Sequence, residues 1–322
     1  MSKFFDDAVI FTDIHFGLKN NSKQHNNDCL NFIKWMIVQS HKRNIKKCFF
    51  LGDWHHHRAT INVSTLNYTV DALQLLNDNF DEVQMIMGNH DLYYREKRDI
   101  NSLPFANKYP NINIINDEIF EEDGVAFVPW LVDDEWKRLK ELKSKFIFGH
   151  FELPDFYLNA MIKMPDHGGL KASDLSKADK VFSGHSDAWD DDRGITFLNW
   201  NGTYDFETWP DAPKYRVANL SQLLDDAGSI LTNNTHCRII LDINISYEEA
   251  NYIKETFATD YNLREISLMP SKKDNVSGED WDTDGDVSVE NVDSIVLSQL
   301  EAITSNSIRN ETLISIYNDL HI

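Results

Sequence analysis

The residues of this sequence that could do chemistry are carboxylates, amides and imidazoles that directly follow short apolar runs. Gly88-Asn89-His90-Asp91 follows the apolar residues 83–87, which predict a buried strand. The arrangement recurs after four other apolar runs, at Asp13-Ile14-His15, Gly52-Asp53, Gly149-His150 and Gly184-His185. Open α/β sheets place their chemistry at the carboxyl ends of the strands. We therefore expect the five motifs to meet at one edge.

The side chains in these motifs are suited to binding divalent metal ions. The candidate ligands are Asp13, His15, Asp53, Asn89, His150 and His185. A mixed oxygen and nitrogen donor set suits manganese or iron better than an all-sulfur zinc site would. One such histidine alone is more often a core or surface group, but six donors that all follow predicted strands favour a metal site.

Two ions bound by these donors would support phosphoester hydrolysis. Ions about 3.5–4 Å apart, bridged by Asp53, can activate a water and hold both oxygens of an in-line phosphoryl displacement. His90 directly follows a candidate ligand, so we expect it to face the substrate and protonate the leaving alcohol. The predicted reaction is the hydrolysis of a phosphoester.

Length, charge and cysteine content limit the class of protein. The 322 residues suffice for one large catalytic domain with smaller appendages. Cys29, Cys48 and Cys237 lack a paired metal-binding spacing, so we expect reduced thiols. The formal charge of −21 argues against a free-standing nucleic-acid binder. A nucleic-acid enzyme with this charge would need metals, a local basic groove or a partner.

The hydropathy of the chain predicts a cytoplasmic protein. No stretch is long and apolar enough for a membrane span. Asp6, Asp7 and Asp13 interrupt the apolar run near the amino terminus, which argues against a signal peptide.

The elements that must position the motifs alternate in type. Apolar residues at helical spacing predict one helix over residues 28–37, capped by Asp28, and another over residues 64–76. With the intervening strands this order predicts a mainly parallel sheet with right-handed crossovers. From residue 112, short strands at 112–115, 119–121 and 125–128 predict a second sheet that packs against the first.

Later segments complete the predicted architecture. A helix is expected over residues 133–142, and an antiparallel hairpin turns at Asn201-Gly202. The predicted fold is α/β, a two-sheet sandwich flanked by helices, with a small α+β capping domain and a helical carboxyl-terminal tail. The expected limits are 1–209 for the catalytic domain, 210–269 for the strand-helix-strand capping domain, 270–286 for an acidic flexible linker and 287–322 for the tail. The apolar stripe of the tail is expected to meet a partner.

The ordered motifs Asp-x-His, Gly-Asp, Gly-Asn-His-Asp, Gly-His and Gly-His resemble those of the calcineurin-like metallophosphoesterases. Further segments, at residues 52–58, 128–130 and 192–194, resemble the SbcD-type recombination nucleases, especially the phage nuclease subunits. The resemblance implies the metallophosphoesterase fold. It also implies a manganese-dependent DNA nuclease, with magnesium as the alternative ion, that has 3′-to-5′ exonuclease and endonuclease activity.

The same resemblance implies partners and residue roles. An SbcC-type coiled-coil ATPase would bind the chain through its carboxyl-terminal helices, a homodimer is expected, and a phage-encoded protein would act in the host cytoplasm. By motif, Asp13, His15 and Asp53 hold one metal, and Asp53, Asn89, His150 and His185 hold the other. His90 matches the catalytic histidine. His56 matches a position near the substrate phosphate or is a plain surface residue of a histidine-rich loop.

The sequence departs from the family pattern at one place. The family ends with Gly-His-x-His, whereas this chain has Gly184-His185-Ser186-Asp187 and lacks the segment that normally follows. Asp187 would either replace the absent histidine as an oxygen ligand or be a solvated loop acid beside a weakened first metal site.

Two other functions compete with a DNA nuclease. One is a metallophosphoesterase that acts on a small phosphoester or phosphoprotein, although such an enzyme has no need of the capping unit and apolar tail. The other is a catalytically weakened scaffold subunit, which the missing second histidine suggests.

Overall fold

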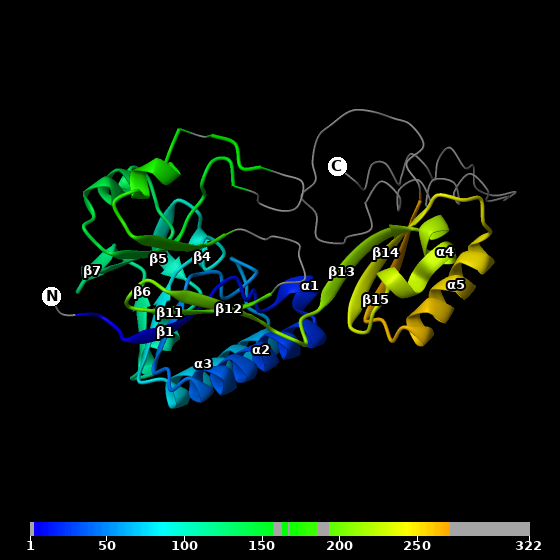
Figure 1. The fold of residues 1–322 in the computed structure, drawn as a ribbon, viewed down its shortest axis with the longest axis horizontal. Helices are drawn as coiled ribbons and strands as arrows, with labels where there is room; N and C mark the ends of the chain where they lie inside the picture. Colours follow the sequence, from blue (N-terminus) through cyan, green and yellow to red (C-terminus); the bar gives the residue numbers. More distant parts are fainter. Residues whose placement is uncertain (1–2, 157–162, 167, 186–192, 271–322) are drawn as a thin grey trace, which may run out of the picture. The chain divides into compact units, whose positions relative to one another are not determined.

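The computed structural model describes residues 3–156, 163–166, 168–185 and 193–270. The predicted tail, nearly all of the linker, and Asp187 lie outside these ranges. Figure 1 shows the described elements as two stacked sheets flanked by helices, followed along the chain by a smaller α/β unit. The predicted α/β class with two packed sheets is confirmed.

The first sheet carries the motifs of the first third of the chain. Its strand order is β12-β11-β1-β2-β3-β6. The strands are β1 (Asp7–Phe11), β2 (Lys47–Phe50), β3 (Glu82–Ile86), β6 (Ile112–Ile115), β11 (Gly194–Asn199) and β12 (Tyr204–Thr208). Strands β1, β2, β3 and β6 are parallel, β11 pairs antiparallel with β1, and β12 pairs antiparallel with β11 at the edge of the sheet. The ends of β1, β2 and β3 therefore point in one direction.

Two long helices cover one face of this sheet. They are α2 (Lys23–Lys42) and α3 (Val63–Asn79), preceded by the single turn α1 (Leu18–Asn21). Side chains of α2 and α3 share one apolar core with those of β1, β2 and β3. The prediction that Asp28 caps the first helix is wrong, because the helix begins earlier and the Ser22 hydroxyl accepts from the His25 N–H. Among the described residues, no helix is long and apolar enough to cross a bilayer.

The second sheet packs on the other face of the first through an aromatic layer. Its order is β10-β9-β8-β7, from β7 (Phe120–Glu122), β8 (Val125–Val128), β9 (Phe146–His150) and β10 (Lys180–Gly184). Phe49 of the first sheet meets Phe127 and Phe148 of the second, with ring centroids 4.9 and 5.0 Å apart. The prediction that residues 112–115 belong to the second sheet is wrong, because β6 pairs in parallel with β3.

The outer face of the second sheet is covered by short 3₁₀ helices. These are η2 (Glu135–Glu141) and η3 (Ala172–Leu175), while η1 (Pro104–Lys108) precedes β6. The helix expected over residues 133–142 is 3₁₀ in type. Trp136, Leu139 and Leu142 pack on this face at intervals of three residues, which matches the three residues per turn of a 3₁₀ helix.

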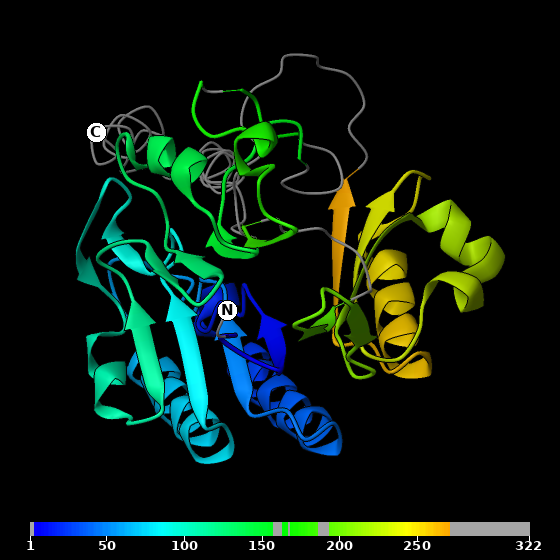
Figure 2. The ribbon, with the colours of Figure 1, turned by 60° about the vertical axis from the view of Figure 1, so that its left-hand side comes forward.

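The sequence did not predict one hairpin of the structure and predicted only part of the smaller unit. The hairpin of β4 (Leu92–Tyr94) and β5 (Lys97–Asn101) was not predicted. The smaller unit contains the predicted β14 (Thr235–Leu241), α5 (Tyr247–Asp260) and β15 (Glu265–Pro270), together with the unpredicted β13 (Lys214–Asn219) and α4 (Leu220–Ile230). This unit has its own apolar core under a parallel three-stranded sheet, seen in Figure 2. The predicted domain limits stay predictions.

Candidate metal centre

The candidate ligands come from the carboxyl ends of five strands in two sheets. Strands β1, β2 and β3 of the first sheet end at the Asp13, Asp53 and Asn89 motifs, and strands β9 and β10 of the second end at His150 and His185. The expectation of a single sheet edge is therefore replaced by two edges that meet. All six donors predicted from the described part of the chain lie together there.

The backbone turns sharply at four of these donors. Asp13, His15, Asp53 and His185 have φ angles of 53°, 49°, 63° and 86°. Each such left-handed residue that is not glycine costs about 1–3 kcal/mol. The surrounding hydrogen bonds hold these turns, since Asp13 N donates to Gly52 O at 3.0 Å and His15 N donates to Asp53 O at 3.1 Å.

One donor group consists of Asp13, His15 and Asp53. Their donor atoms all lie within 4.8 Å of one another. His15 Nε2 is 3.9 Å from Asp13 Oδ1 and 3.7 Å from Asp53 Oδ2. His15 Nδ1 is buried and has no hydrogen-bond partner among the described residues. Asp53 and His15 are almost fully buried, at 2 and 8 % exposure.

A second donor group shares Asp53. His150 Nε2 lies 3.4 Å from Asp53 Oδ2 and 3.0 Å from Asn89 Oδ1. His185 Nδ1 lies 3.0 Å from the same Asn89 oxygen. Adjacent ligands of an octahedral ion, each about 2.1 Å from it, would be separated by about 3 Å. The spacing of these donors fits an ion of that size.

The chemistry of the donor set also fits a cation. The Nδ1–H of His150 donates to the Leu51 carbonyl at 2.7 Å, so Nε2 faces the Asp53 and Asn89 oxygens. These atoms need a positive species between them, either a proton on Nε2 or a metal ion. Burial alone would lower the pKa of His150, but the Asp53 carboxylate raises it to about 10. A divalent ion would satisfy the same demand.

The other donors have the protonation states that ligands require. Burial lowers the pKa of His15 and of His185 to about 3, which leaves both imidazoles neutral. Burial would raise the pKa of Asp53, but His150 and His15 hold it below its ordinary value. Asp53 is therefore ionised.

His90 and His56 lie beside the donors. The Nδ1–H of His90 donates to the His56 carbonyl at 2.7 Å, and its backbone N–H donates to Asp53 Oδ1 at 2.8 Å. With Nδ1 donating, Nε2 is the nitrogen that can exchange a proton with a substrate. The His56 ring stacks on that of His90 at 5.3 Å, and both rings lie within 5.5 Å of His15. The neighbouring His55 is instead a core residue, bonded to Ser102 and Thr69.

Two glycines leave the space that these side chains occupy. A Cβ on Gly88 would overlap the Asp53 carboxylate. A Cβ on Gly184 would lie 2.7 Å from both His150 Nδ1 and Leu51 O. Gly88 and Gly184 therefore have a steric role next to the donors.

Asp91 is a functional residue that the sequence analysis did not identify. Its fully buried carboxylate accepts from the N–H groups of Gly88, Asp53, Trp54 and His55 at 2.8–3.1 Å. These bonds fix the loop after β2 to the loop after β3. Burial and the charge of Asp53 raise the pKa of Asp91, and its N–H partners oppose that rise. The acidic residue that ends the motif Gly-Asn-His-Asp could have indicated this role in the sequence.

Trp130 belongs to segment 128–130, which resembles the family, but no role at the metal centre was predicted for it. Its ring lies 5.2 Å from that of His185 and 6.0 Å from that of His150, and it closes one side of the centre. Its position directly after β8 and Pro129 could have indicated this role. A cavity of about 200 Å³ includes Trp130, His150 and Glu152 among its lining residues.

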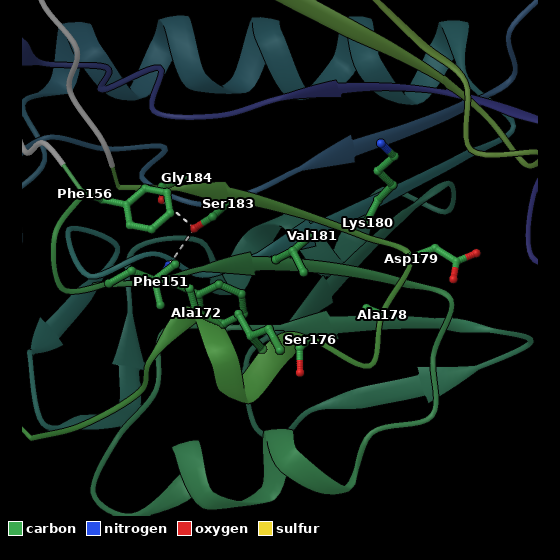
Figure 3. Close-up of a pocket in the computed structure, with 12 residues that line it drawn as sticks. Phe151, Phe156, Ala172, Ser176, Ala178, Asp179, Lys180, Val181, Ser183 and Gly184 are labelled. Atoms are coloured by element: carbon green, nitrogen blue, oxygen red, sulfur yellow. Dashed lines mark hydrogen bonds between the residues drawn. The ribbon is translucent and has the colours of Figure 1, made fainter.

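A larger cavity, of about 580 Å³, lies along β10 and is distinct from the donor cluster. Figure 3 shows Phe151, Phe156 and Val181 around it, with Ser183 Oγ accepting from Phe151 N at 3.0 Å. Its described lining residues include Gly184 but none of the donor side chains. This cavity therefore does not mark the chemistry. Asp187, the remaining candidate ligand, lies outside the described residues.

Residues 8–216 match the calcineurin-like phosphoesterase family, and the chain belongs to that family. The resemblance seen in the motifs is thereby confirmed, and the donor cluster lies within the matched residues. The chain is a metallophosphoesterase by family, and its His and Asp side chains form groups that could hold a metal ion, with the Asn89 oxygen beside one of them.

Individual relatives are more distant. The exonuclease subunit 1 of Enterobacteria phage T4 is 29% identical over 181 residues, which are 54% of this chain and 52% of the phage protein. The chain thus spans about half the length of that relative. A solved structure, the nuclease MPE of Pseudomonas putida, matches 37% of this chain and 52% of its own at 22% identity, with a TM-score of 0.27.

Proposed function

We propose that this chain is the nuclease subunit of a DNA recombination or repair complex and that it hydrolyses phosphodiester bonds with two divalent ions. The observation that carries the proposal is that Asp53 belongs to two donor groups at once, with His90 directly beside both. The phage relative named an exonuclease subunit supports DNA as the substrate. Manganese is the proposed ion, with magnesium as the alternative, because half of the donors are oxygens.

The proposed roles follow from the two groups. One ion is held by Asp13, His15 and Asp53, and the other by Asp53, Asn89, His150 and His185. When bound, such ions activate a water and neutralise the charge that develops on the phosphate. His90 gives a proton from Nε2 to the leaving oxygen, and His56 lies near the scissile phosphate. Asp187 stays a prediction from the sequence.

The test is cleavage of DNA by the purified chain. Linear duplex labelled at its 5′ end should yield a ladder of shortened products with manganese and none in EDTA, as 3′-to-5′ digestion requires. Circular single-stranded DNA should report endonuclease activity. Hydrolysis of bis(p-nitrophenyl) phosphate without cleavage of either DNA would favour a small substrate. Failure to bind metal or cleave anything would favour a scaffold subunit.

The proposed partner is a coiled-coil ATPase, bound by residues 287–322 beyond the linker 270–286. Removal of the chain after Gly285 should preserve manganese-dependent cleavage, because the metal donors all lie earlier, and should abolish binding of the ATPase. Capture of the ATPase by the truncated chain would contradict this proposal. Homodimer formation, implied by the family resemblance, is checked by light scattering.

A further inference from the structure

The β4–β5 hairpin exposes two adjacent aromatic rings. Tyr93 and Tyr94 are 45 and 47 % exposed, although large apolar surfaces are usually buried. Consecutive residues of a regular strand point to opposite faces of a sheet. Here the pairing register shifts between Leu92 and Tyr94, and the two rings meet edge to face with centroids 4.7 Å apart. The hairpin thus presents an aromatic surface instead of two separate rings.

The hairpin is fixed firmly to the protein. Leu92 is fully buried, and Ser102 N donates to Asp91 O at 2.8 Å. The Arg98 guanidinium is buried and donates to the carbonyls of Trp130 and Asp117 at 2.9 and 2.7 Å. A ligand on this surface would meet rings whose supporting strand is already ordered, which lowers the entropic cost of binding.

The surface adjoins the metal centre. Trp130 Nε1 donates to the Arg95 carbonyl at 3.1 Å, and the Arg95 guanidinium lies 5.1 Å from the Trp130 ring. The same ring is 5.2 Å from His185. One aromatic side chain, Trp130, therefore lies between the tip of the hairpin and a candidate metal ligand, and Tyr93 and Tyr94 directly precede that tip in the chain.

Cationic groups accompany the rings in a chain whose net charge is −21. Arg95 is 44 % exposed at its side chain and is held by Glu152 at 2.7 Å. Lys97 lies 5.9 Å from the Tyr94 ring. Arg58, half-buried beside the centre, has its pKa lowered by burial and by the neighbouring Arg95. Arg58 comes two residues after His56 in the loop that follows β2, and Arg95 lies at the tip of the β4–β5 hairpin, so each can offer a phosphate the paired N–H donors of a guanidinium group.

We propose that the β4–β5 hairpin binds a single nucleic-acid strand, with unpaired bases stacked on Tyr93 and Tyr94 and backbone phosphates at Arg58 and Arg95. The proposal rests on the nuclease function proposed above and identifies which part of the substrate this face holds. Every base has a π face, so aromatic rings beside cations bind single strands without sequence preference. Paired bases inside a duplex do not offer that face. A protein partner fits less well, because Arg95, next to Tyr94 in the chain, contacts the Trp130 ring that lies beside the candidate metal ligand His185.

The test measures strand binding separately from chemistry. The full chain in EDTA is titrated into fluorescein-labelled oligothymidine and, separately, into a labelled blunt duplex, and fluorescence anisotropy is recorded. Hydrolysis of bis(p-nitrophenyl) phosphate with manganese measures the activity of the metal centre independently of strand binding. Tyr93→Ala and Tyr94→Ala should each weaken oligothymidine binding about tenfold, since a stacked base contributes about 1–3 kcal/mol. Turnover of the small substrate should stay unchanged.

Matched variants separate stacking from folding. Tyr94→Phe keeps the π face and should bind as the unaltered chain does. Tyr252→Ala removes a ring that is 72 % exposed on α5 and should change nothing. Arg58→Gln should weaken binding and reduce the dependence of log Kd on log salt by about 0.7, the value for one phosphate contact on a single strand.

The outcomes distinguish this proposal from the one on which it rests. If the unaltered chain cleaves DNA while both tyrosine variants bind oligothymidine normally, the hairpin proposal is wrong and the nuclease function stands. If the variants keep strand binding but lose self-association or association with the ATPase, the surface docks protein and the proposal is overturned. An unaltered chain that neither binds nor cleaves DNA refutes both proposals.

Discussion

Replacing Asp91 by asparagine removes one charge and one acceptor while keeping the shape of the side chain. Oδ1 accepts from Trp54 N and His55 N, and Oδ2 accepts from Asp53 N and Gly88 N. An asparagine has one oxygen, so its NH₂ group must face two of these N–H donors whichever way the amide turns. Two buried backbone donors would lose their acceptor.

The cost follows from the strength of such bonds. A hydrogen bond to a charged group contributes about 1.5–3 kcal/mol, so losing two should destabilise the fold by about 3–6 kcal/mol. With a slope of about 3 kcal/mol per molar urea, the unfolding midpoint should fall by about 1–2 M. The freed loops also carry Asp53 and Asn89, so manganese bound per chain, measured by mass spectrometry, should fall in the same variant.

The matched control is Asp99→Asn, at an exposed acid in the adjoining strand β5. It should change neither the urea midpoint nor the metal content. If Asp91→Asn unfolds at the same urea concentration as the unaltered chain and binds as much manganese, then the four N–H bonds do not hold the two loops together, and the assigned role of Asp91 is wrong.

Three other variants test the centre. His90→Ala should lower DNA cleavage by about 10²–10⁴-fold with two manganese ions still bound, because His90 is assigned proton transfer; metal loss in this variant would contradict that role. Asn89→Ala should lower metal affinity and cleavage together, by more than about tenfold, and unchanged metal titration would exclude Asn89 as a ligand. Gly184→Ala should displace His150 and weaken metal binding, since its Cβ would lie 2.7 Å from His150 Nδ1, whereas Gly169→Ala, with no atom within 4 Å, should not.

The parts of the fold that could be predicted from sequence are those with a strong local signal. Strands β2, β3 and β9 are short apolar runs that end at glycine or a polar motif, β8 is one that ends before Pro129, and the limits of all four were found to within a few residues. The candidate ligands could be named because each directly follows such a run. The meeting of the Asp13, Asp53 and Asn89 motifs could be expected from a general property of parallel sheets, whereas the approach of His150 and His185 depends on how a second sheet packs on the first.

The predictions from sequence fail where contacts between distant parts of the chain determine the structure. Residues 112–115 have the same composition whichever sheet they join, and only the pairing of Ile112 with Val83 assigns them to the first sheet. The β4–β5 hairpin was missed because residues 92–101 lack an apolar strand pattern, and its stability comes from the burial of Leu92 and Arg98 against the rest of the protein. Likewise, the role of Asp91 depends on N–H donors 36–38 residues away.

The division of the donors between two sheets gives the aromatic layer a part in the chemistry. Asp53 and Asn89 belong to the first sheet, His150 and His185 to the second, and the contact between Asp53 Oδ2 and His150 Nε2 spans only 3.4 Å. Phe148, two residues before His150, stacks on Phe127 at 5.0 Å and meets Phe49 across the layer. A change of about 1 Å in the separation of the sheets would be enough to disturb a centre of this size. The phenylalanines therefore set the distance between the two halves of the site.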